Sequence, residues 1–392
     1  MSLRTRRIVL LVTAPVIAFA LVGGVLTHVL AADDPYPSLK IFSDVESLIS
    51  SNYVEKVDID KVMTGAMHGL ADSLDPDSAF LTPDQVKLVD ANAPMAAGDV
   101  GIDLTRQGYL RIIAVRDGSP AARAGLMTGD FVRIIGDTPT RDMSVFAGMR
   151  QLRGAIGSKV SLTIIRDSPN DPHVVELTRE ATPANDVSGR MVGTGVGYVR
   201  IAAIGAKTAD QVKAEIGTLS KTGATSLILD VRRTSGGLLD GGLALARLFV
   251  PKGTLAFRES KGANKQTDKE AIDAVPGDGT ITMPAVVLLD LGTSSAAELF
   301  ASAMAGNQRA DLIGEHTIGR AARQKLIKLP DGSGLWLTTT RYLMPDGKPL
   351  HEHGLEPSVA VDEPEVKFGQ TAPAGDPILD KALEQLSTKK AA

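Results

Sequence analysis

The N-terminus carries the feature that most constrains how this chain folds, an uncharged apolar run from Ile8 to Leu30. Three arginines precede the run and two aspartates follow it, at positions 33 and 34. Its 23 residues match the roughly 20 needed to cross a bilayer, yet Val29-Leu30-Ala31 also resembles a small-residue cleavage site. Residues 1–33 are therefore expected to be either a membrane anchor or a cleaved signal peptide. Because the arginines stay on the cytoplasmic side, the rest of the chain is expected on the extracytoplasmic, periplasmic side.

The overall composition is that of an ordinary globular protein. Of 392 residues, 43% are hydrophobic and 22% charged, which favours two or three domains. A formal net charge of -4 provides no broad positive field, so no nucleic-acid partner is expected. The absence of cysteine excludes disulfides, thiolate catalysis and Cys-ligated metals. We expect no cofactor, and the sequence does not indicate an oligomeric state.

Changes in apolar periodicity and in turn residues divide the chain after residue 33 into four parts. Apolar residues first recur at helical spacing, interrupted by turn chemistry at Leu74 to Ser78. Short β-rich runs separated by Gly, Pro and Asp follow, and strands then alternate with helices, which predicts an α/β core. The parts are an N-terminal helical segment (34–96), a β-rich module (97–183), the α/β core (190–361) and a polar C-terminal tail closing on an amphipathic helix (362–392).

The β-rich module carries three glycine-containing motifs in a fixed order. They are Gly98 to Leu104, Gly118 to Leu126 and the pair Gly129-Asp130. Together they resemble the PDZ domains of bacterial proteases, rather than a generic turn between strands. The resemblance implies that an extended peptide adds to a sheet edge and that its terminal carboxylate meets backbone N–H groups at Gly101 and Ile102. Without side chains at Gly98 and Gly101, another backbone can approach closely.

A serine lies where a strand is expected to meet a helix. The apolar run Val286 to Leu289 precedes Gly292-Thr293-Ser294-Ser295, and a helical pattern starts at Ala296. A hydroxyl at a helix N-terminus is close to free N–H groups and to the positive end of the helix dipole, which stabilise a developing oxyanion. Serine before a helix is also a common N-cap. The local pattern leaves both interpretations open.

Further segments resemble one family, the C-terminal processing (tail-specific) serine peptidases, and they cover residues 195–361. The resemblance implies a multidomain protein with an α/β spiral (ClpP/crotonase-like) peptidase core, a PDZ domain and an N-terminal helical segment after the membrane or signal helix. It also implies endopeptidase cleavage near the C-termini of proteins or unstructured peptides, with the PDZ domain presenting the tail. The segments are Leu229 to Leu239, Gly314 to Arg320 with Gln324, Asp331 to Thr339, Arg341-Tyr342, Pro345 to Gly347, and Gly354 to Pro357.

The resemblance assigns roles position by position. Ser295 takes the nucleophile's place, with Ser294 the less suitable neighbour, and Gln324 takes the position that orients the base. The alternative for Gln324 is an exposed polar residue on a strand. The segment Arg233-Thr234-Ser235 departs from the family's usual Asn and Pro. The oxyanion hole would be formed by the backbone N–H of Ala296 and that of Gly236 or Gly237.

The departure with the largest consequence is Arg320, which stands where the family has its general-base lysine. Burial can lower a lysine pKa to 7–8 and free its amine to accept the serine proton. Lowering a guanidinium pKa from about 13.8 to 8 would cost roughly 8 kcal/mol, comparable with the stability of a whole domain. Arg320 is therefore not expected to act as the base, although it occupies the catalytic position.

Three alternatives follow from Arg320. A nearby His316, Lys325 or Lys328 substitutes as the base, although strand alternation directs Lys325 away from the face of Gln324. Alternatively, Ser295 and the oxyanion hole alone give weak hydrolysis. In the third alternative the protein is a pseudopeptidase that acts as a peptide-binding scaffold.

Two other interpretations of the core are less favoured. The Gly236-Gly237 pair is also compatible with acyl-CoA hydratases, which share the spiral core, but the PDZ motifs and the export signal argue against them. His351 and His353 flank Glu352 and would suggest a metal site, but a loop histidine pair without a third ligand is expected to be a surface feature. No metal site is therefore predicted.

Overall fold

The computed structural model describes residues 36–391 except 184–185, 263, 265 and 371–372. The predicted anchor or signal, residues 1–33, lies outside these residues. Among the described helices, none combines the length and apolar character needed to span a bilayer. The chain divides into two compact units, residues 1–66 and residues 67–392. The first unit contains α2 (Tyr36–Asn52), whose apolar side chains are largely exposed, and the start of α3 (Ile59–Asp72).

The second unit begins with the end of α3 and a short helix-capped segment. The turn chemistry predicted at Leu74 to Ser78 is present, and it leads into β1 (Ala79–Leu81). Thr82 then caps α4 (Pro83–Asp90) with a reciprocal pair of hydrogen bonds to Gln85. The helical segment predicted from the sequence is thus α2, α3 and α4, with one strand that the sequence reasoning missed.

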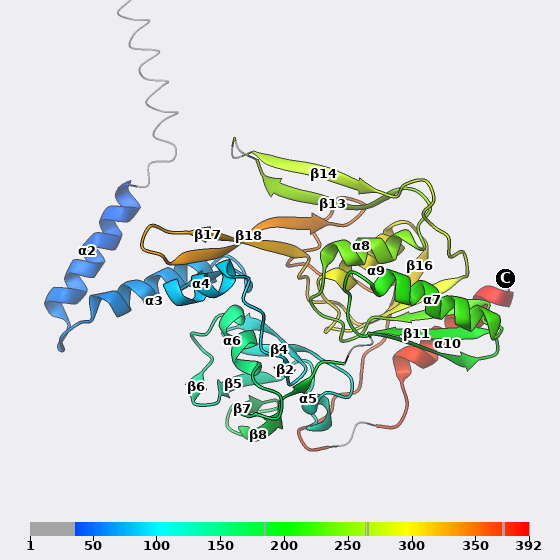
Figure 1. Ribbon diagram of the computed structural model, residues 1–392, viewed down its shortest axis with the longest axis horizontal. Helices are drawn as coiled ribbons and strands as arrows, with labels where there is room; N and C mark the ends of the chain where they lie inside the picture. Colours follow the sequence, from blue (N-terminus) through cyan, green and yellow to red (C-terminus); the bar gives the residue numbers. More distant parts are fainter. Residues whose placement is uncertain (1–35, 184–185, 263, 265, 371–372, 392) are drawn as a thin grey trace, which may run out of the picture. The chain divides into compact units, whose positions relative to one another are not determined.

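The PDZ module is an antiparallel sheet with two short helices (Figure 1). Its core gathers inward-facing apolar residues of the longer strands, including Leu104, Ile112 and Leu162. The strand order is β3-β4-β5-β7-β8, so β3 is an edge strand. The elements are β2 (Gly98–Asp99), β3 (Ile102–Gln107), β4 (Tyr109–Val115), α5 (Pro120–Arg123), β5 (Phe131–Ile135), β6 (Thr138–Pro139), α6 (Val145–Leu152), β7 (Lys159–Ile165), β8 (His173–Thr178) and β9 (Glu180–Ala181).

The α/β core is built on a six-stranded sheet of order β10-β11-β12-β15-β16-β19, parallel except for the β10–β11 hairpin. Helices cover both faces, which explains why the central strands are continuously apolar. The elements are β10 (Val187–Gly193), β11 (Val196–Ile201), α7 (Thr208–Lys221), β12 (Ser226–Asp230), α8 (Leu239–Arg247), β15 (Ala285–Leu289), α9 (Ala296–Gly306), β16 (Ala310–Gly314), β19 (Val359–Ala360) and α10 (Pro377–Ala391).

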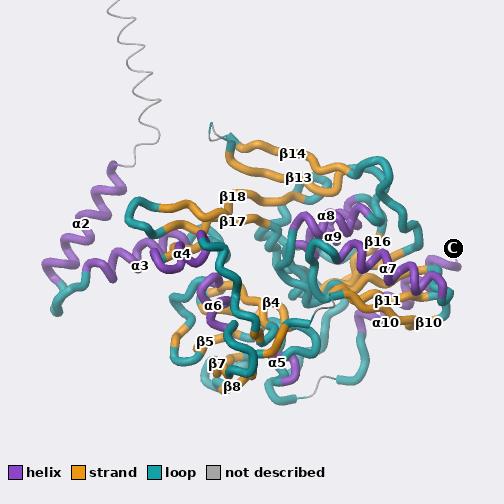
Figure 2. The backbone as a smooth tube through the Cα atoms, viewed as in Figure 1, coloured by secondary structure: helices purple, strands orange, loops and turns teal. Residues whose placement is uncertain are grey.

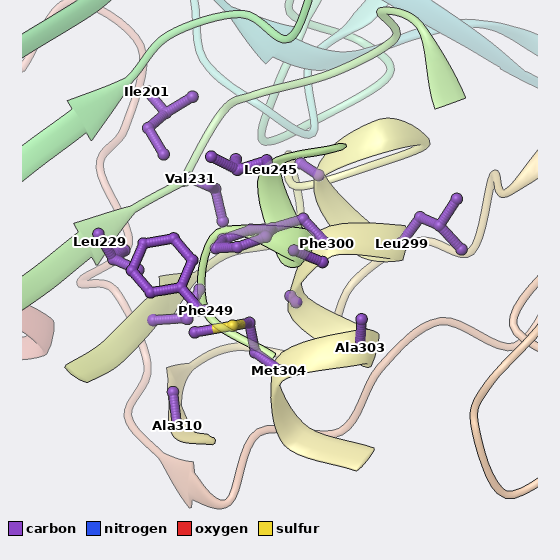
Figure 3. Close-up of a cluster of buried hydrophobic side chains, with 14 of the residues drawn as sticks. Ile201, Leu229, Val231, Leu245, Phe249, Leu299, Phe300, Ala303, Met304 and Ala310 are labelled. Atoms are coloured by element: carbon purple, nitrogen blue, oxygen red, sulfur yellow. The ribbon is translucent and has the colours of Figure 1, made fainter. Parts of the chain in front are cut away.

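Alternate residues of β12 and β15 belong to two different hydrophobic clusters. Leu229 and Val287 pack with α8 and α9, whereas Ile228 and Val286 pack with α10. Figure 3 shows the larger cluster, in which Phe249, Phe300 and Met304 fill the space beside the sheet. The helix α9 is almost completely buried, because its many alanines let it approach its neighbours closely. Ser295, the N-cap residue of α9, is therefore attached to a rigid, buried helix.

A second sheet carries the remaining strands (Figure 2). Its order is β1-β18-β13-β14, and β17 pairs with β18. The strand β17 follows the segment that contains Arg320 and bears Gln324. Its elements are β13 (Thr254–Lys261), β14 (Thr267–Asp273), β17 (Ala322–Lys328) and β18 (Gly334–Leu343), besides β1. The predicted fold class, an α/β core with a β-rich PDZ domain, is confirmed.

Candidate active site

Ser295 occupies the turn between β15 and α9, where the sequence predicted a strand-to-helix junction. Its backbone has φ 58° and ψ −115°, a conformation that costs a non-glycine residue free energy and persists only where its surroundings enforce it. Ser294, by contrast, is fully buried and its Oγ donates to Ser235 Oγ at 2.8 Å. Ser295 is only partly buried. Of the two serines, Ser295 is therefore the accessible one.

Glu298 fixes the position of Ser295. This carboxylate is completely buried in the first turn of α9, and its Oε2 accepts from the backbone N–H of Ser295 at 2.9 Å and from that of Arg320 at 2.8 Å. Its Oε1 accepts from Thr317 Oγ1 and from Gly319 N, both at 2.6 Å. Burial raises the pKa of Glu298, and these hydrogen bonds offset part of that rise. The side chain of Glu298 thus holds the backbone of Ser295 and that of Arg320 at fixed positions relative to each other.

The guanidinium of Arg320 points to partners outside the core. Its Nε donates to Asp77 Oδ2 at 3.0 Å, its Nη2 pairs with Asp77 Oδ1, and its Nη1 donates to the carbonyl of Leu104 at 2.9 Å. Desolvation acts to lower the pKa of Arg320, but the charge of Asp77, the hydrogen bonds to it and the nearby charges of Asp103 and Glu298 together raise this pKa. Arg320 is therefore a permanent cation, as the sequence predicted.

The turn predicted at Leu74 to Ser78 is the element that presents Asp77. Asp75 Oδ1 accepts from the backbone N–H of Asp77 and Ser78 at 2.8 and 2.7 Å, which fixes the loop. Ser78 Oγ in turn accepts from Thr338 N at 3.1 Å and joins the loop to β18. The sequence predicted turn chemistry here but no active-site partner, because Asp77 and Arg320 are 243 positions apart.

The residues expected to form the oxyanion hole lie together, but the N–H of Ala296 is already engaged. Gly236 and Gly237 both have positive φ, 66° and 81°. The backbone N–H of Ala296 donates to the carbonyl of Gly236 at 3.3 Å. In this conformation a carbonyl oxygen therefore occupies the place that a substrate oxyanion would need. A Cβ at Gly237 would lie 2.3 Å from the carbonyl of Ile204, so only glycine fits there.

The turn before these glycines is held by a buried acid. Arg233 has φ 55°, and its backbone N–H donates to Asp290 Oδ1 at 2.8 Å. Thr293 Oγ1 donates to the same oxygen at 3.0 Å. Burial raises the pKa of Asp290 to about 6. Asp290 thus links the glycine turn with the turn that carries Ser295.

Gln324 and the three alternative bases face away from Arg320 or into solvent. Gln324 Nε2 donates to Thr338 Oγ1 at 3.1 Å on the neighbouring strand. Lys325 is exposed, as strand alternation predicted, and Lys328 pairs with Asp90. The side chain of His316 is 46% exposed and its Nε2 lies 3.6 Å from Glu356. The structure does not bring these groups to Ser295 through a hydrogen bond.

The surface location expected for His351 is wrong. Its residue is 7% exposed, because the loop folds back over Gly319. His351 lines a cavity of about 330 Å³ together with Asp77, Gly319 and Arg320. Within the described residues its Nδ1 has no hydrogen-bond partner. Besides Glu298 and Asp77, His351 is thus a third residue near Arg320 that the sequence reasoning did not assign to the site.

In the PDZ module, the close approaches expected at Gly98 and Gly101 are made by the chain itself. A Cβ at Gly98 would lie 2.8 Å from the carbonyl of Gly154, and one at Gly101 would lie 2.2 Å from Ser119 Cβ. Gly101 has φ 78° and precedes Ile102, the first residue of the edge strand β3. Both glycines are required by the fold of the module, whatever it binds.

Comparisons with known proteins agree with this architecture. The sequence profile described as "Peptidase family S41" matches residues 195–361, and a PDZ-domain profile matches residues 111–166. The carboxyl-terminal-processing protease of Synechocystis sp. is 30% identical over 349 residues, which cover 87% of this chain and 81% of that protein. The carboxy-terminal processing protease of Bacillus subtilis is 31% identical over 320 residues, covering 81% and 67%.

A solved structure extends the similarity to the fold. The photosystem II D1 C-terminal processing protease superposes with a TM-score of 0.66 and 26% identity, covering 82% of this chain and 92% of that chain. With relatives at 30% identity over most of its length, the chain belongs to peptidase family S41.

Proposed function

We propose that this protein is a serine endopeptidase that cleaves proteins or unstructured peptides near their C-termini, with Ser295 as nucleophile and the PDZ module presenting the tail. The observation that carries this proposal is the strained, partly exposed Ser295 held at the start of a buried helix by Glu298. The strained backbone of Ser295 costs folding free energy, and strain of this kind is concentrated at active sites, where it positions a reactive group.

In the proposed reaction, Ser295 Oγ attacks the scissile carbonyl carbon and its proton passes to a base. The tetrahedral oxyanion forms beside the N-terminus of α9, the peptide nitrogen leaves with a proton, and water then hydrolyses the ester. Each hydrogen-bond donor to the oxyanion typically contributes about 3 kcal/mol. The glycine turn must supply one such donor and Ala296 the other.

A rotation of one peptide unit would assemble that oxyanion hole. The carbonyl of Gly236, which now accepts from Ala296, and the N–H of Gly237 belong to the same peptide unit. Rotating this unit replaces the carbonyl by the N–H and frees the donor of Ala296. Because both residues are glycines with positive φ, the rotation meets little steric resistance from side chains. We propose that substrate binding accompanies this rotation.

The base is a group other than Arg320, which keeps its proton. We propose His351, because its imidazole lines the same cavity as Arg320 and its Nδ1 has no partner within the described residues. Histidine is also the side chain best suited to proton transfer near neutral pH. Asp77 then acts as the counter-charge of Arg320, and neither Asp77 nor Gln324 is the proton acceptor.

The location of the protein belongs to the same proposal. Residues 1–33 export the chain, as an anchor or as a cleaved signal, so that the peptidase acts on the extracytoplasmic, periplasmic side of the membrane. The three arginines before Ile8 and the 23-residue apolar run support this orientation.

Cleavage of a synthetic tail tests the function. The full-length protein is incubated with an unstructured peptide that ends in apolar residues and a free carboxylate, and the products are identified by mass spectrometry. We expect cleavage by the wild type and by Ser294→Ala, but not by Ser295→Ala. His351→Gln should lower kcat at least a hundredfold, whereas His316→Gln should not.

Two outcomes would speak against the proposal. Cleavage that survives Ser295→Ala would remove the nucleophile assignment. Peptide binding without any cleavage, by the wild type and by all variants, would favour the alternative of a pseudopeptidase scaffold.

A further inference from the structure

The loop that enters β3 already holds a carboxylate. Asp99 Oδ1 accepts from the backbone N–H of Val100 at 2.7 Å and from that of Gly101 at 3.2 Å. Successive N–H groups that converge on one point form a concave site for an anion. Here the anion is the side chain of the residue that precedes them. Gly101 is one of the two residues at which the terminal carboxylate of a ligand is expected.

A cation completes this arrangement. Arg153 Nη2 pairs with Asp99 Oδ2 at 2.8 Å, and both side chains are largely buried, with 25% and 15% exposed. The pair is brought together by reciprocal backbone hydrogen bonds between Gly98 and Gly154, at 2.9 and 3.1 Å. Arg153 follows α6, which packs against β3. Its Nε has no hydrogen-bond partner within the described residues.

The carboxylate of Asp99 and the end of a peptide are chemically the same group. Each offers two oxygens that share one negative charge and accept hydrogen bonds from N–H donors. Two carboxylates cannot both take the N–H of Gly101, which Asp99 and the expected ligand position share, because like charges at contact distance repel and one of them would lose this donor. A ligand that brings its own carboxylate must therefore displace Asp99.

We propose that Asp99 is a built-in competitor for C-terminal carboxylates, and that Arg153 is the cation for which Asp99 and the ligand compete. This inference rests on the proposed presentation of tails by the PDZ module, and it names the residues that set its selectivity. With Asp99 in place, the module discriminates little between a free and an amidated chain end. When Asp99 is displaced, the N–H groups of Val100 and Gly101 and the guanidinium of Arg153 bind the ligand's carboxylate.

The competing explanation is a purely structural role, in which Asp99 only stabilises the loop. The two explanations differ in one measurable quantity, the ratio of affinities for a free-acid and an amidated peptide of the same sequence. Loss of a structural hydrogen bond would change both affinities by the same factor. Loss of a competitor would improve the affinity for the free acid alone.

The experiment measures peptide binding by fluorescence anisotropy to the full-length protein carrying Ser295→Ala, so that the peptide stays intact. Asp99→Asn keeps the shape of the side chain but removes its charge. We expect it to raise the affinity for the free acid about tenfold, since charge-assisted hydrogen bonds are roughly twice as strong as neutral ones, and to leave that for the amide unchanged. Asp99→Ala should have the same or a larger effect.

Two further variants make the result specific. Arg153→Gln added to Asp99→Asn should abolish the gain, because the cation that receives the ligand's carboxylate is then missing. Asp137→Asn removes the same charge from an exposed turn between β5 and β6, and it should leave the ratio of affinities unchanged. Thermal melting verifies that each variant is folded.

Equal gains for acid and amide, or no gain with either Asp99→Asn or Asp99→Ala, would overturn the proposal. These results are distinguishable from a failure of the proposed function. Catalysis is measured separately as cleavage by the chain with Ser295 intact, and a module that binds no peptide at all would contradict presentation of the tail itself.

Discussion

At the scale of single residues, Arg320 and Asp77 explain how the core accommodates a permanent cation in the lysine position. A buried guanidinium is costly unless it is paired, and breaking such a pair typically costs 3–5 kcal/mol. Asp77 supplies the counter-charge and the carbonyl of Leu104 satisfies a further donor. The charge of Asp77 that stabilises Arg320 would also favour the protonated form of a lysine at position 320 and keep its pKa high.

Arg320→Lys alone should therefore restore a general base poorly. Asp77 favours the charged form of any amine beside it, so the lysine pKa stays high and the gain in rate appears only at alkaline pH. Combining Arg320→Lys with Asp77→Asn removes that charge. We expect the double variant to gain about 10²-fold in kcat/KM over Arg320→Lys near neutral pH, measured as peptide cleavage from pH 6 to 10.

A second arginine–aspartate pair, whose arginine lies on β17, is the control for this prediction. Arg323 and Asp240 also form an ion pair, at 3.2 Å, but both side chains are largely exposed. Arg323→Lys with Asp240→Asn should leave the pH–rate profile unchanged. If the double variant at positions 77 and 320 were no more active than the wild type at any pH, the lysine argument would be wrong.

Asp290 makes the free energy of unfolding depend on pH. Burial, and to a smaller extent the charge of Glu363, raise its pKa from 3.8 to about 6, although the N–H of Arg233 opposes the rise. A carboxyl whose pKa is higher in the folded state contributes its full stability below about pH 4 and loses it as the pH rises through 6. Asp290→Asn should therefore gain about 3 kcal/mol relative to the wild type between pH 4 and 7.

Thermal melting of both proteins at closely spaced pH values measures this difference. A constant difference between Asp290→Asn and the wild type across that range would show that Asp290 does not titrate there.

At the scale of elements, the sequence predicted those whose burial follows a clear period. Strands β5 and β11 and helices α7 and α8, which the sequence predicts at 131–135, 197–201, 209–219 and 239–248, appear within one or two residues of these limits. The strand β14 was not predicted, because it is almost entirely exposed and its sequence has no apolar alternation. The sequence pointed to Ser295 and the glycine turn through its resemblance to the family, because the local pattern alone left an N-cap open. It could not identify Asp77 or the buried His351, because these depend on contacts between distant segments.

The glycine turn between β12 and α8 gives a test at this scale. A Cβ at Gly236 meets nothing within 4 Å, whereas one at Gly237 would lie 2.3 Å from the carbonyl of Ile204. Gly236→Ala should therefore cost about 1–2 kcal/mol for its left-handed backbone alone. Gly237→Ala must also move the backbone of α8 or of Ile204, and it should be the more destabilising of the two.

Activity separates the two glycines as well. If the peptide unit between them rotates, both substitutions slow catalysis in proteins that remain folded. Unfolding midpoints and kcat values of the two variants decide this, and a Gly237→Ala variant as stable and active as the wild type would contradict the required close approach.

At the scale of the whole molecule, the order of segments is itself informative. The proposed N-terminal export segment, the peptide-binding module and the peptidase core are expected to act together on chain ends that are exposed outside the cytoplasm. Cell fractionation tests the first of these. We expect the full-length protein in the membrane fraction or released on the extracytoplasmic side, and a chain lacking residues 1–33 in the cytoplasm. A full-length protein found in the cytoplasm would contradict export.

The most direct test of the central claim is covalent labelling of the full-length protein with a fluorophosphonate, which reacts with activated serine hydroxyls. Intact-mass and peptide-level mass spectrometry then locate the adduct. The structure predicts one adduct, on Ser295, in the wild type and a faster reaction in the variant that combines Arg320→Lys with Asp77→Asn. The absence of any adduct on Ser295 in both proteins, at neutral and at alkaline pH, would contradict its assignment as the nucleophile.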